Sequence, residues 1–374
     1  MTGAPRQRVI DWLVLAQAPR VGPRTIAQLV QRFGGPGEVL AAGRSALLDA
    51  GVSAEAIAAF RSPDQAAIDA ALDWCEREQA AILTPDDPRY PPLLAELDAP
   101  PPFLFVRGDT EVLLEPQIAV VGSRNPTQGG IATSGEFARY LAGLGITITS
   151  GLAIGIDGAA HLGALEAGRT IAVLGTGPDR VYPATHHDLA RRIADNGALV
   201  TEFLPGTGPH AKHFPRRNRV ISGLSLGTLV VEAAPNSGSL ITARYAAEQG
   251  REVFAIPGSI HNPLARGCHA LIRQGAKLVD SADQILEELS AQLRRFTAAP
   301  PAASGDPKPE GAASLDAEYR QLLDCMGYDP LAPDELIARC GLSAQAVSSM
   351  LLLLELQGYV SSHPGGRYSL RGSR

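Results

Sequence analysis

The sequence contains few of the residues that build metal, redox or membrane sites. Its 374 residues include only four cysteines, which show neither CxxC pairing nor the spacing of metal ligands: Cys75, Cys268, Cys325 and Cys340. Apolar runs are short, since the densest one, residues 350–354, is followed directly by Glu355. Asp11 interrupts the apolar part of the N-terminal stretch, which argues against a signal peptide. We therefore expect a cytoplasmic protein with reduced thiols and without a membrane span, a metal or a cofactor.

Positive charge is also scarce across the chain as a whole. There are 33 Lys and Arg residues against 39 Asp and Glu residues, which gives a formal net charge of −6. Binding of a polyanion over the whole surface is therefore excluded, and any nucleic-acid contact requires a local basic patch. One such patch is present, because four cations fall within eight residues: Lys212, Arg216, Arg217 and Arg219.

The segment that holds this patch, residues 212–225, has the pattern of a helix start. Pro215 is tolerated in a first turn, and apolar residues follow at helical spacing. Helix N-termini attract anions, and arginine forks beside a ring such as Phe214 are typical of grooves for single-stranded nucleic acid. Alternatively, the segment is a solvated basic helix start with Phe214 tucked into the core.

The first 116 residues predict a helical module followed by a connector. Residues 1–82 read as short helices joined by glycine turns and resemble a helix-hairpin-helix or sterile-alpha-motif-like module. The amides of its turns could bind phosphate, but beyond Arg20 and Arg24 these turns carry few cations, which favours a small helical cap. Residues 83–116 are rich in proline and predict an ordered connector or a short edge strand.

Residues 117–296 predict a doubly wound, Rossmann-like α/β domain. Short apolar runs there are mostly followed by a turn and a helical pattern, which indicates a parallel sheet with both faces covered. Ligands of such sheets bind at the carboxyl ends of the strands. The predicted strands are Ile118–Val121, Ile146–Thr149, Ile171–Leu174, Leu199–Val200, Leu229–Val231 and Val253–Ile256.

The C-terminal part predicts a linker and a small domain. Residues 297–314 are rich in alanine and proline and predict a disordered linker. Residues 315–374 predict three helices and a hairpin, which resemble a winged helix. The candidate recognition helix, Ser343–Gln357, contains no Lys or Arg, although a reader of duplex DNA needs phosphate contacts. We therefore expect this domain to contact protein or to act as a scaffold.

Two strand-end loops carry candidate site residues. Gly122, Ser123 and Arg124 follow the first strand without the G-x-G-x-x-G dinucleotide fingerprint, so the loop either binds phosphate or is a plain turn. After the second strand, Asp157 is predicted to cap a helix, and the nearby glycines permit close packing. His161 is predicted to be a structural histidine.

The loop after the fifth strand combines a carboxylate with small residues. Glu232 could be catalytic, or it could fix a backbone amide or an arginine. The second interpretation is favoured, because no nucleophile, base and orienting group can be assembled here. Ser237, Gly238 and Ser239 lead into a helix through Thr242, and the amides at its start would face an anion. We therefore expect a binding protein rather than an enzyme.

Taken in order, these motifs resemble the DNA-processing protein A family (DprA, also called Smf). The resemblance implies a homodimer that binds single-stranded DNA and loads RecA recombinase onto it during natural transformation. It also implies that Arg124 belongs to the Gly-Ser-Arg loop of the DNA site, and that Lys212, Phe214, Arg217, Asn218 and Arg219 form its pocket. We expect the whole site to comprise Gly122, Ser123, Arg124, Lys212, Phe214, Arg216, Arg217, Asn218, Arg219, Ser237, Gly238 and Ser239, supported by Asp157, Glu232 and Thr242.

An enzyme of the nucleotide phosphoribohydrolase type is the alternative. Such lysine-decarboxylase-like enzymes carry a Pro-Gly-Gly-x-Gly-Thr signature, whereas the corresponding loop here, residues 234–239, reads Ala-Pro-Asn-Ser-Gly-Ser. The basic cluster of residues 212–219 suits a polymer better than a single nucleotide.

Overall fold

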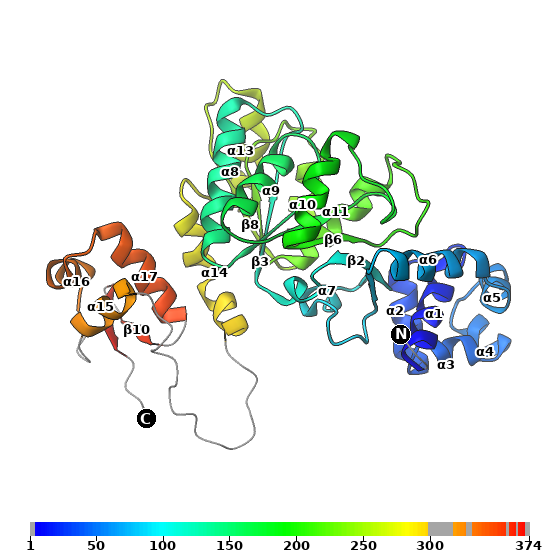
Figure 1. Cartoon of the computed structure of the whole chain (residues 1–374). Coiled ribbons are helices and arrows are strands. Elements are labelled where there is room, and N and C mark those ends of the chain that lie inside the picture. Colours follow the sequence, from blue (N-terminus) through cyan, green and yellow to red (C-terminus); the bar gives the residue numbers. More distant parts are fainter. Residues whose placement is uncertain (1–3, 298–316, 327–330, 357–358, 364–365, 371–374) are drawn as a thin grey trace, which may run out of the picture. The chain divides into compact units, whose positions relative to one another are not determined.

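The computed structural model describes residues 4–297, 317–326, 331–356, 359–363 and 366–370 (Figure 1). Contacts divide the chain into two compact units, Met1–Glu288 and Leu289–Arg374. The predicted linker, residues 297–314, lies outside the described residues except for Thr297. Among the residues that the structure describes, no helix is both long enough and apolar enough to cross a membrane.

The first unit begins with a helical module that has its own core. Turn residues set its boundaries: Gly34, at φ +98°, donates its N–H to the Val30 carbonyl and ends one helix, whereas Ser53 accepts from the Ala56 N–H at 3.1 Å and caps another. Buried side chains such as Leu15, Ile26 and Leu47 fill the space between the helices. The helices are α1 (Ala4–Gln17), α2 (Pro23–Phe33), α3 (Pro36–Ala41), α4 (Arg44–Asp49), α5 (Ala54–Arg61) and α6 (Gln65–Arg77).

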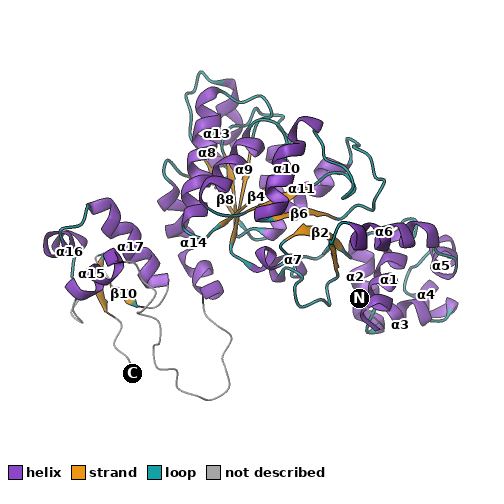
Figure 2. Cartoon of the chain, in the orientation of Figure 1, coloured by secondary structure: helices purple, strands orange, loops and turns teal. Residues whose placement is uncertain are grey.

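A nine-stranded sheet follows the module (Figure 2). Its strand order is β1-β2-β6-β5-β4-β3-β7-β8-β9, and all pairs from β6 to β9 are parallel. The strands are β1 (Ala81–Leu83), β2 (Leu104–Gly108), β3 (Gln117–Val121), β4 (Thr147–Ser150), β5 (Thr170–Val173), β6 (Ala198–Thr201), β7 (Gly227–Val230), β8 (Glu252–Ala255) and β9 (Lys277–Leu278).

The connection order reverses at β3, which makes this strand the topological switch point. From β3 the chain proceeds through β4 and β5 to β6, and it then returns to the other side of β3 with β7. In open α/β sheets the crevice for a ligand lies at such a reversal, outside the carboxyl ends of the strands. The predicted doubly wound fold is therefore confirmed, with its switch point between β3 and β7.

Helices cover both faces of the sheet. Alternate strand residues enter different cores: Ile171 of β5 packs in the core that contains Val220, whereas Ala172 packs in the core that contains Leu189. Helices α8, α9 and α10 pack next to one another, and α11 packs against α12. The helices are α7 (Pro92–Ala95), α8 (Gln128–Gly143), α9 (Ile156–Ala167), α10 (His187–Asn196), α11 (His213–Leu224), α12 (Ser239–Glu248), α13 (Arg266–Arg273) and α14 (Ala282–Thr297), with short 3-10 turns at Glu111–Leu114, Ala184–His186 and Pro263–Ala265.

The proline-rich segment of residues 83–116 contributes directly to this sheet. β2 pairs antiparallel with both β1 and β6, so the sheet extends upstream of the predicted domain boundary at residue 117. Phe103 and Phe105 share a core with Leu13 and Trp74 of the helical module. The module is thereby packed onto the antiparallel edge of the sheet within one compact unit.

The described part of the second unit contains the three helices and the hairpin that the sequence predicts. Leu322, Leu336, Val347, Leu354 and Val360 are buried together and form its core. The hairpin pairs antiparallel, with Val360 opposite Leu370. The elements are α15 (Ala317–Cys325), α16 (Pro333–Cys340), α17 (Ala344–Leu356), β10 (Val360–His363) and β11 (Arg367–Leu370), which is a winged-helix-like arrangement.

Candidate nucleic-acid interface

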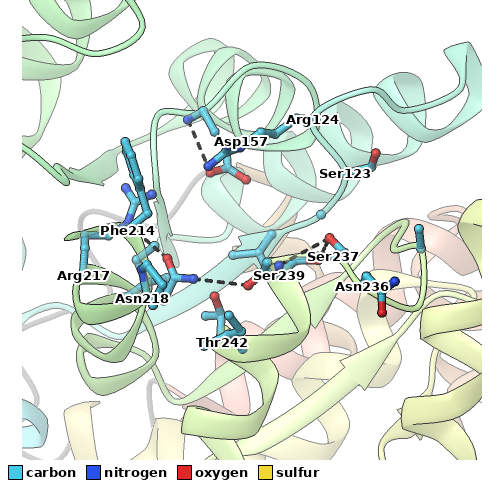
Figure 3. A pocket seen from close by; sticks show the side chains of 18 of the residues that line it. Ser123, Arg124, Asp157, Phe214, Arg217, Asn218, Asn236, Ser237, Ser239 and Thr242 are labelled. Atoms are coloured by element: carbon cyan, nitrogen blue, oxygen red, sulfur yellow. Dashed lines mark hydrogen bonds between the residues drawn. The ribbon is translucent and has the colours of Figure 1, made fainter. Parts of the chain in front are cut away.

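A cavity of about 770 Å³ opens at the carboxyl ends of β3, β4 and β7 (Figure 3). We call it the strand-end pocket. Its walls come from the loops that follow these strands, from the loops after β5 and β6, and from the starts of α11 and α12. It lies at the switch point of the sheet, where the topology predicts a ligand.

The pocket brings together most of the site residues expected from the sequence. Four expected residues do not line it: Lys212, Arg216, Arg219 and Glu232. The expected residues that line it are Gly122, Ser123, Arg124, Asp157, Phe214, Arg217, Asn218, Ser237, Gly238, Ser239 and Thr242.

Arg124 and Phe214 are in contact in the pocket. The Arg124 guanidinium lies 5.5 Å from the centroid of the Phe214 ring, within reach of a cation–π contact. Tyr182 lies on the Phe214 ring as well, with 5.5 Å between the centroids and a tilt of 44°. A Cβ atom at Gly175 would come within 2.8 Å of the Phe214 ring, so a glycine is needed there. The sequence left two alternatives for Phe214, a ring in a DNA groove or a ring in the core. The residue is half-buried, so it is intermediate between them.

Arg217 is a buried part of the pocket wall rather than an open cation. Only 4% of the residue is exposed, and its Nη1 atom donates to the carbonyls of Gly151, at 2.6 Å, and Val173. A Cβ atom at Gly151 would lie 2.7 Å from the guanidinium, so this glycine makes room for it. Burial lowers the pKa of Arg217 to about 10, although the charge of Asp157 opposes this shift. The guanidinium therefore ties α11 to the ends of β4 and β5.

The prediction that Asp157 caps α9 is wrong. Gly155 occupies the N-cap position, and Asp157 lies inside the first turn. Its carboxylate reaches back and accepts from the backbone N–H groups of Gly151, at 3.2 Å, and Ala153, at 3.4 Å. Burial raises the pKa of Asp157, and the positive charge of Arg217 partly offsets this effect. Asp157 thus holds the loop between β4 and α9 in shape.

The opposite wall joins α11 to the start of α12. The Asn218 side-chain amide donates to the Gly238 carbonyl at 3.2 Å, and it also accepts from Arg217 Nε at 3.2 Å (Figure 3). The hydroxyls of Ser237 and Ser239 lie 2.7 Å apart. α12 begins without an acidic residue in its first turn, so its N-terminus presents partial positive charge to the pocket.

The remaining basic residues surround a carboxylate that the sequence analysis missed. Glu202 is buried and accepts from Arg216, at 3.1 Å to each carboxylate oxygen, and from Arg219. Arg219 also donates to the Ala99 carbonyl at 2.6 Å, so it faces away from the strand-end pocket. Lys212 is exposed and directly precedes α11. The basic cluster is therefore divided. Arg217 lies in the pocket wall, Lys212 is on the surface, and the other two arginines form ion pairs with Glu202.

Glu232 fixes a backbone amide, which is one of the two structural roles considered from the sequence. Its carboxylate accepts from the Thr127 N–H at 2.8 Å and from the Thr127 hydroxyl at 2.6 Å. Thr127 itself caps α8, because its hydroxyl accepts from the Gly130 N–H at 2.9 Å. Glu232 therefore anchors the loop that carries Ser123 and Arg124.

His161 is a structural histidine that is fully buried within α9. Its Nδ1 atom lies 2.7 Å from the Thr170 hydroxyl, which itself donates to the Ile148 carbonyl at 2.6 Å. Thr170 therefore accepts from Nδ1–H, and the unprotonated Nε2 atom has no hydrogen-bond partner among the residues that the structure describes. Burial lowers the pKa of His161 to about 3, so the ring is neutral at physiological pH.

The pocket has the chemistry of an anion and base binder. Among the described residues that line it there is no histidine and no cysteine. Within the described parts of the chain, no group of three or more His, Cys, Asp or Glu side chains is arranged to hold a metal ion. What the walls do offer is one exposed guanidinium, two aromatic rings and the N-terminus of a helix.

Sequence reasoning missed three contributors to this region. Tyr182 and Asn236 line the pocket, and Glu202 organises two of the arginines beside it. A signal for Glu202 exists, because it follows an apolar strand as Glu232 does. Tyr182 lies in a loop whose course depends on tertiary packing, so no local pattern indicates that its ring meets Phe214.

Comparisons with known proteins place the chain in a family. The model of DNA recombination-mediator protein A matches residues 81–290, a DprA-like N-terminal HHH domain matches residues 6–69, and a DprA winged helix domain matches residues 306–366. Protein Smf of Escherichia coli K12 is 44% identical over 314 residues, which is 83% of this chain and 83% of that protein. DNA processing protein DprA of Bacillus subtilis is 44% identical over 224 residues, or 59% of this chain and 75% of that protein.

Solved structures agree with these matches. The structure of DprA from Streptococcus pneumoniae aligns with a TM-score of 0.64 and 35% identity over 77% of this chain and 99% of that one. DNA processing protein A from Helicobacter pylori, whose structure addresses its single-stranded DNA binding mode, aligns with a TM-score of 0.52 and 29% identity over 57% and 97%. Because a family model covers more than half of the chain and the Smf relative is matched over most of its length, this chain belongs to the DNA recombination-mediator protein A family of DprA and Smf proteins.

Proposed function

We propose that the strand-end pocket binds single-stranded DNA without strong sequence preference. The observation that carries this proposal is the contact between Arg124 and Phe214, which brings a guanidinium beside an aromatic ring at the switch point of the sheet. A ring can stack on any base, and a guanidinium can fork onto any phosphate, so neither contact selects a sequence. Single-stranded DNA binding by the Helicobacter pylori relative supports the same class of ligand for this chain.

We further propose that the protein acts as a recombination mediator. In this role it binds incoming single strands in the cytoplasm during natural transformation, loads RecA recombinase onto them and functions as a homodimer. The description of the matching family model supports the mediator role. The four free cysteines, three of them buried, fit a reducing compartment. Light scattering on the full chain tests the dimer, and a monomer at high micromolar concentration would contradict it.

The proposal is non-enzymatic, and the position of Glu232 supports this over a nucleotide hydrolase. Both carboxylate oxygens of Glu232 are occupied by Thr127, and the residue does not line the strand-end pocket. Incubation with nucleoside monophosphates should therefore release neither base nor phosphate. Turnover that disappears in Glu232→Gln, while the fold is retained, would support the hydrolase instead.

A comparison of single-stranded and duplex DNA tests the proposed function. The probe is a labelled oligonucleotide, alone or annealed to its complement, and the readout is fluorescence anisotropy at moderate salt. We expect the single strand to bind at least about tenfold more tightly, a difference of about 1.4 kcal/mol, because a duplex hides the base faces that Phe214 would contact. Equal or tighter binding of the duplex would overturn the assignment.

A further inference from the structure

A second cavity, of about 310 Å³, lies where the helical module meets the α/β domain. We call it the junction pocket. Gly22 and Pro23 at the start of α2 form one wall, and Phe203, Thr207, His213 and Arg216 form the other. All of these residues belong to the first compact unit of the chain.

The junction pocket and the strand-end pocket share the first turn of α11. His213 lines the junction pocket, and the next residue, Phe214, lines the strand-end pocket. The segment before this turn is shared in the same way, because Thr207 lines the junction pocket and Pro209 lines the strand-end pocket. A DNA strand that passes over the exposed Lys212, just before α11, could therefore enter both pockets.

The ion-pair group of Arg216, Arg219 and Glu202 carries an excess of positive charge, and two of its members, Arg216 and Glu202, line the junction pocket. Arg216 and Arg219 share a single carboxylate, that of Glu202, which leaves one positive charge unbalanced in this group. The Arg216 side chain remains 46% exposed although Glu202 holds it. Across the pocket, α2 begins without an acidic residue in its first turn and without a side-chain cap, so its amide end also favours an anion.

The junction pocket also contains rings at stacking distance. The centroids of Phe203 and His213 lie 4.5 Å apart, and the Arg216 guanidinium lies 5.1 Å from the Phe203 ring centroid. Nδ1 of His213 is buried and has no hydrogen-bond partner among the described residues. A cation beside aromatic rings is the combination with which proteins bind single-stranded nucleic acid.

We propose that the junction pocket is a second subsite that takes another nucleotide of the same DNA strand. Arg216 binds its phosphate, and the ring of His213, backed by Phe203, contacts its base. This inference rests on the proposed function, and it adds that the binding groove extends from the α/β domain to the helical module. It follows that an oligonucleotide long enough to reach both cavities binds more tightly than one that fills only the strand-end pocket.

Charge substitutions at Thr207 test this subsite without removing any side-chain hydrogen bond found in the structure. The Thr207 backbone donates to Leu204 and accepts from Gly177, and neither bond depends on the side chain. Thr207→Glu introduces an anion, and Thr207→Lys introduces a cation at the same point. Arg216→Ala removes the proposed phosphate ligand, while Glu202 keeps Arg219 as its partner. Arg191→Ala, at an exposed arginine of α10 outside both cavities, is the matched control.

The readout is the affinity of the full chain for thymidine oligonucleotides of about 4 and about 16 nucleotides, which bracket the usual site sizes for single strands. We expect Thr207→Glu and Arg216→Ala to weaken binding of the long oligonucleotide by about fivefold or more, the low end of the contribution of one nucleotide. Thr207→Lys should bind it at least as tightly as the parent, and the short oligonucleotide should distinguish none of the variants.

Long-oligonucleotide affinities that match the parent in Thr207→Glu and Arg216→Ala would overturn the second subsite. Equal weakening of the short oligonucleotide would also overturn it, because the effect would then arise in the strand-end pocket. A parent protein that binds neither oligonucleotide would overturn the proposed function itself. If the parent binds both oligonucleotides but binds the long one no more tightly than the short one, the second subsite is wrong and the proposed function stands.

Discussion

The Arg124 guanidinium and the Phe214 ring lie 5.5 Å apart, although their residues are 90 positions apart in the chain. Arg124 stands on the loop after β3, which Glu232 anchors, and Phe214 stands in the first turn of α11. The contact therefore joins two motifs that lie far apart in the sequence. It also places a charged group and a stacking surface on one wall of a single pocket.

Phe214→Ala should weaken binding of single-stranded DNA by about 1–3 kcal/mol, the range for loss of one stacked base. The slope of log affinity against log salt should not change, because no charge is removed. Phe214→Tyr, which keeps the ring, is the matched control and should bind nearly as the parent does. Anisotropy titrations at several salt concentrations measure both quantities, after circular dichroism has verified the fold. Unchanged affinity in folded Phe214→Ala would show that the ring only supports the loop.

Arg217→Ala should act mainly on stability. The change removes a guanidinium that binds two backbone carbonyls and leaves the buried Asp157 without its nearest compensating charge. Removal of one partner of a buried charge pair typically costs about 3–5 kcal/mol. Addition of Asp157→Asn to this variant should restore part of the loss in urea unfolding. If Arg217→Ala is as stable as the parent and the slope of its log DNA affinity against log salt falls by about 0.7, Arg217 is instead a phosphate ligand.

The sequence predicts the architecture well because the apolar patterns are local. Each predicted strand overlaps an observed one, and the run of 117–121 is buried throughout, as expected for a parallel sheet covered on both faces. Strand β2, which lies between β1 and β6, was less evident, because proline-rich residues surround it and its pairing with β6 joins residues almost 100 positions apart. Long-range pairing of this kind leaves no periodic signal in a short window.

The sequence predicted most residues of the candidate site, but it did not predict where their side chains point. Four nearby cations in residues 212–219 read as one basic surface, yet they point in different directions around the start of α11. Arg217 enters a space that Gly151 leaves free, and Arg219 turns toward Glu202. These directions depend on partners from distant strands, so spacing alone could not assign them.

His161 should make stability depend on pH. Its folded pKa, about 3, lies below the ordinary value of 6.5, so the unfolded chain binds the proton more readily. The contribution of neutral His161 to the free energy of unfolding is therefore complete above about pH 6.5 and is lost as the pH falls toward 3. Between pH 6.5 and about 5.5, the parent should lose on the order of 1 kcal/mol more stability than His161→Gln.

Urea unfolding of the parent and of His161→Gln at both pH values measures this difference. Asp157, whose pKa is raised, contributes in the opposite sense, and it is common to both proteins. Parallel pH profiles of the two proteins would show that His161 is not the group responsible.

The tail domain should be dispensable for binding of single-stranded DNA. Helix α17 carries no Lys or Arg, so its surface lacks the phosphate ligands on which nucleic-acid affinity depends. Truncation after Thr297 should leave the affinity within a few-fold of the full chain. A loss of more than about tenfold, or roughly 1.4 kcal/mol, would show that the tail supplies a main binding surface.

The salt dependence of Arg124→Ala tests the central claim most directly. Arg124 is exposed in the strand-end pocket, so its replacement should leave the fold intact and remove one phosphate contact. We predict weaker binding of a long single-stranded oligonucleotide, with the slope of log affinity against log salt reduced by about 0.7. Arg191→Ala, on the exposed surface of α10, should match the parent in both quantities. If folded Arg124→Ala binds as tightly as the parent, with the same slope, the strand-end pocket is not the DNA site.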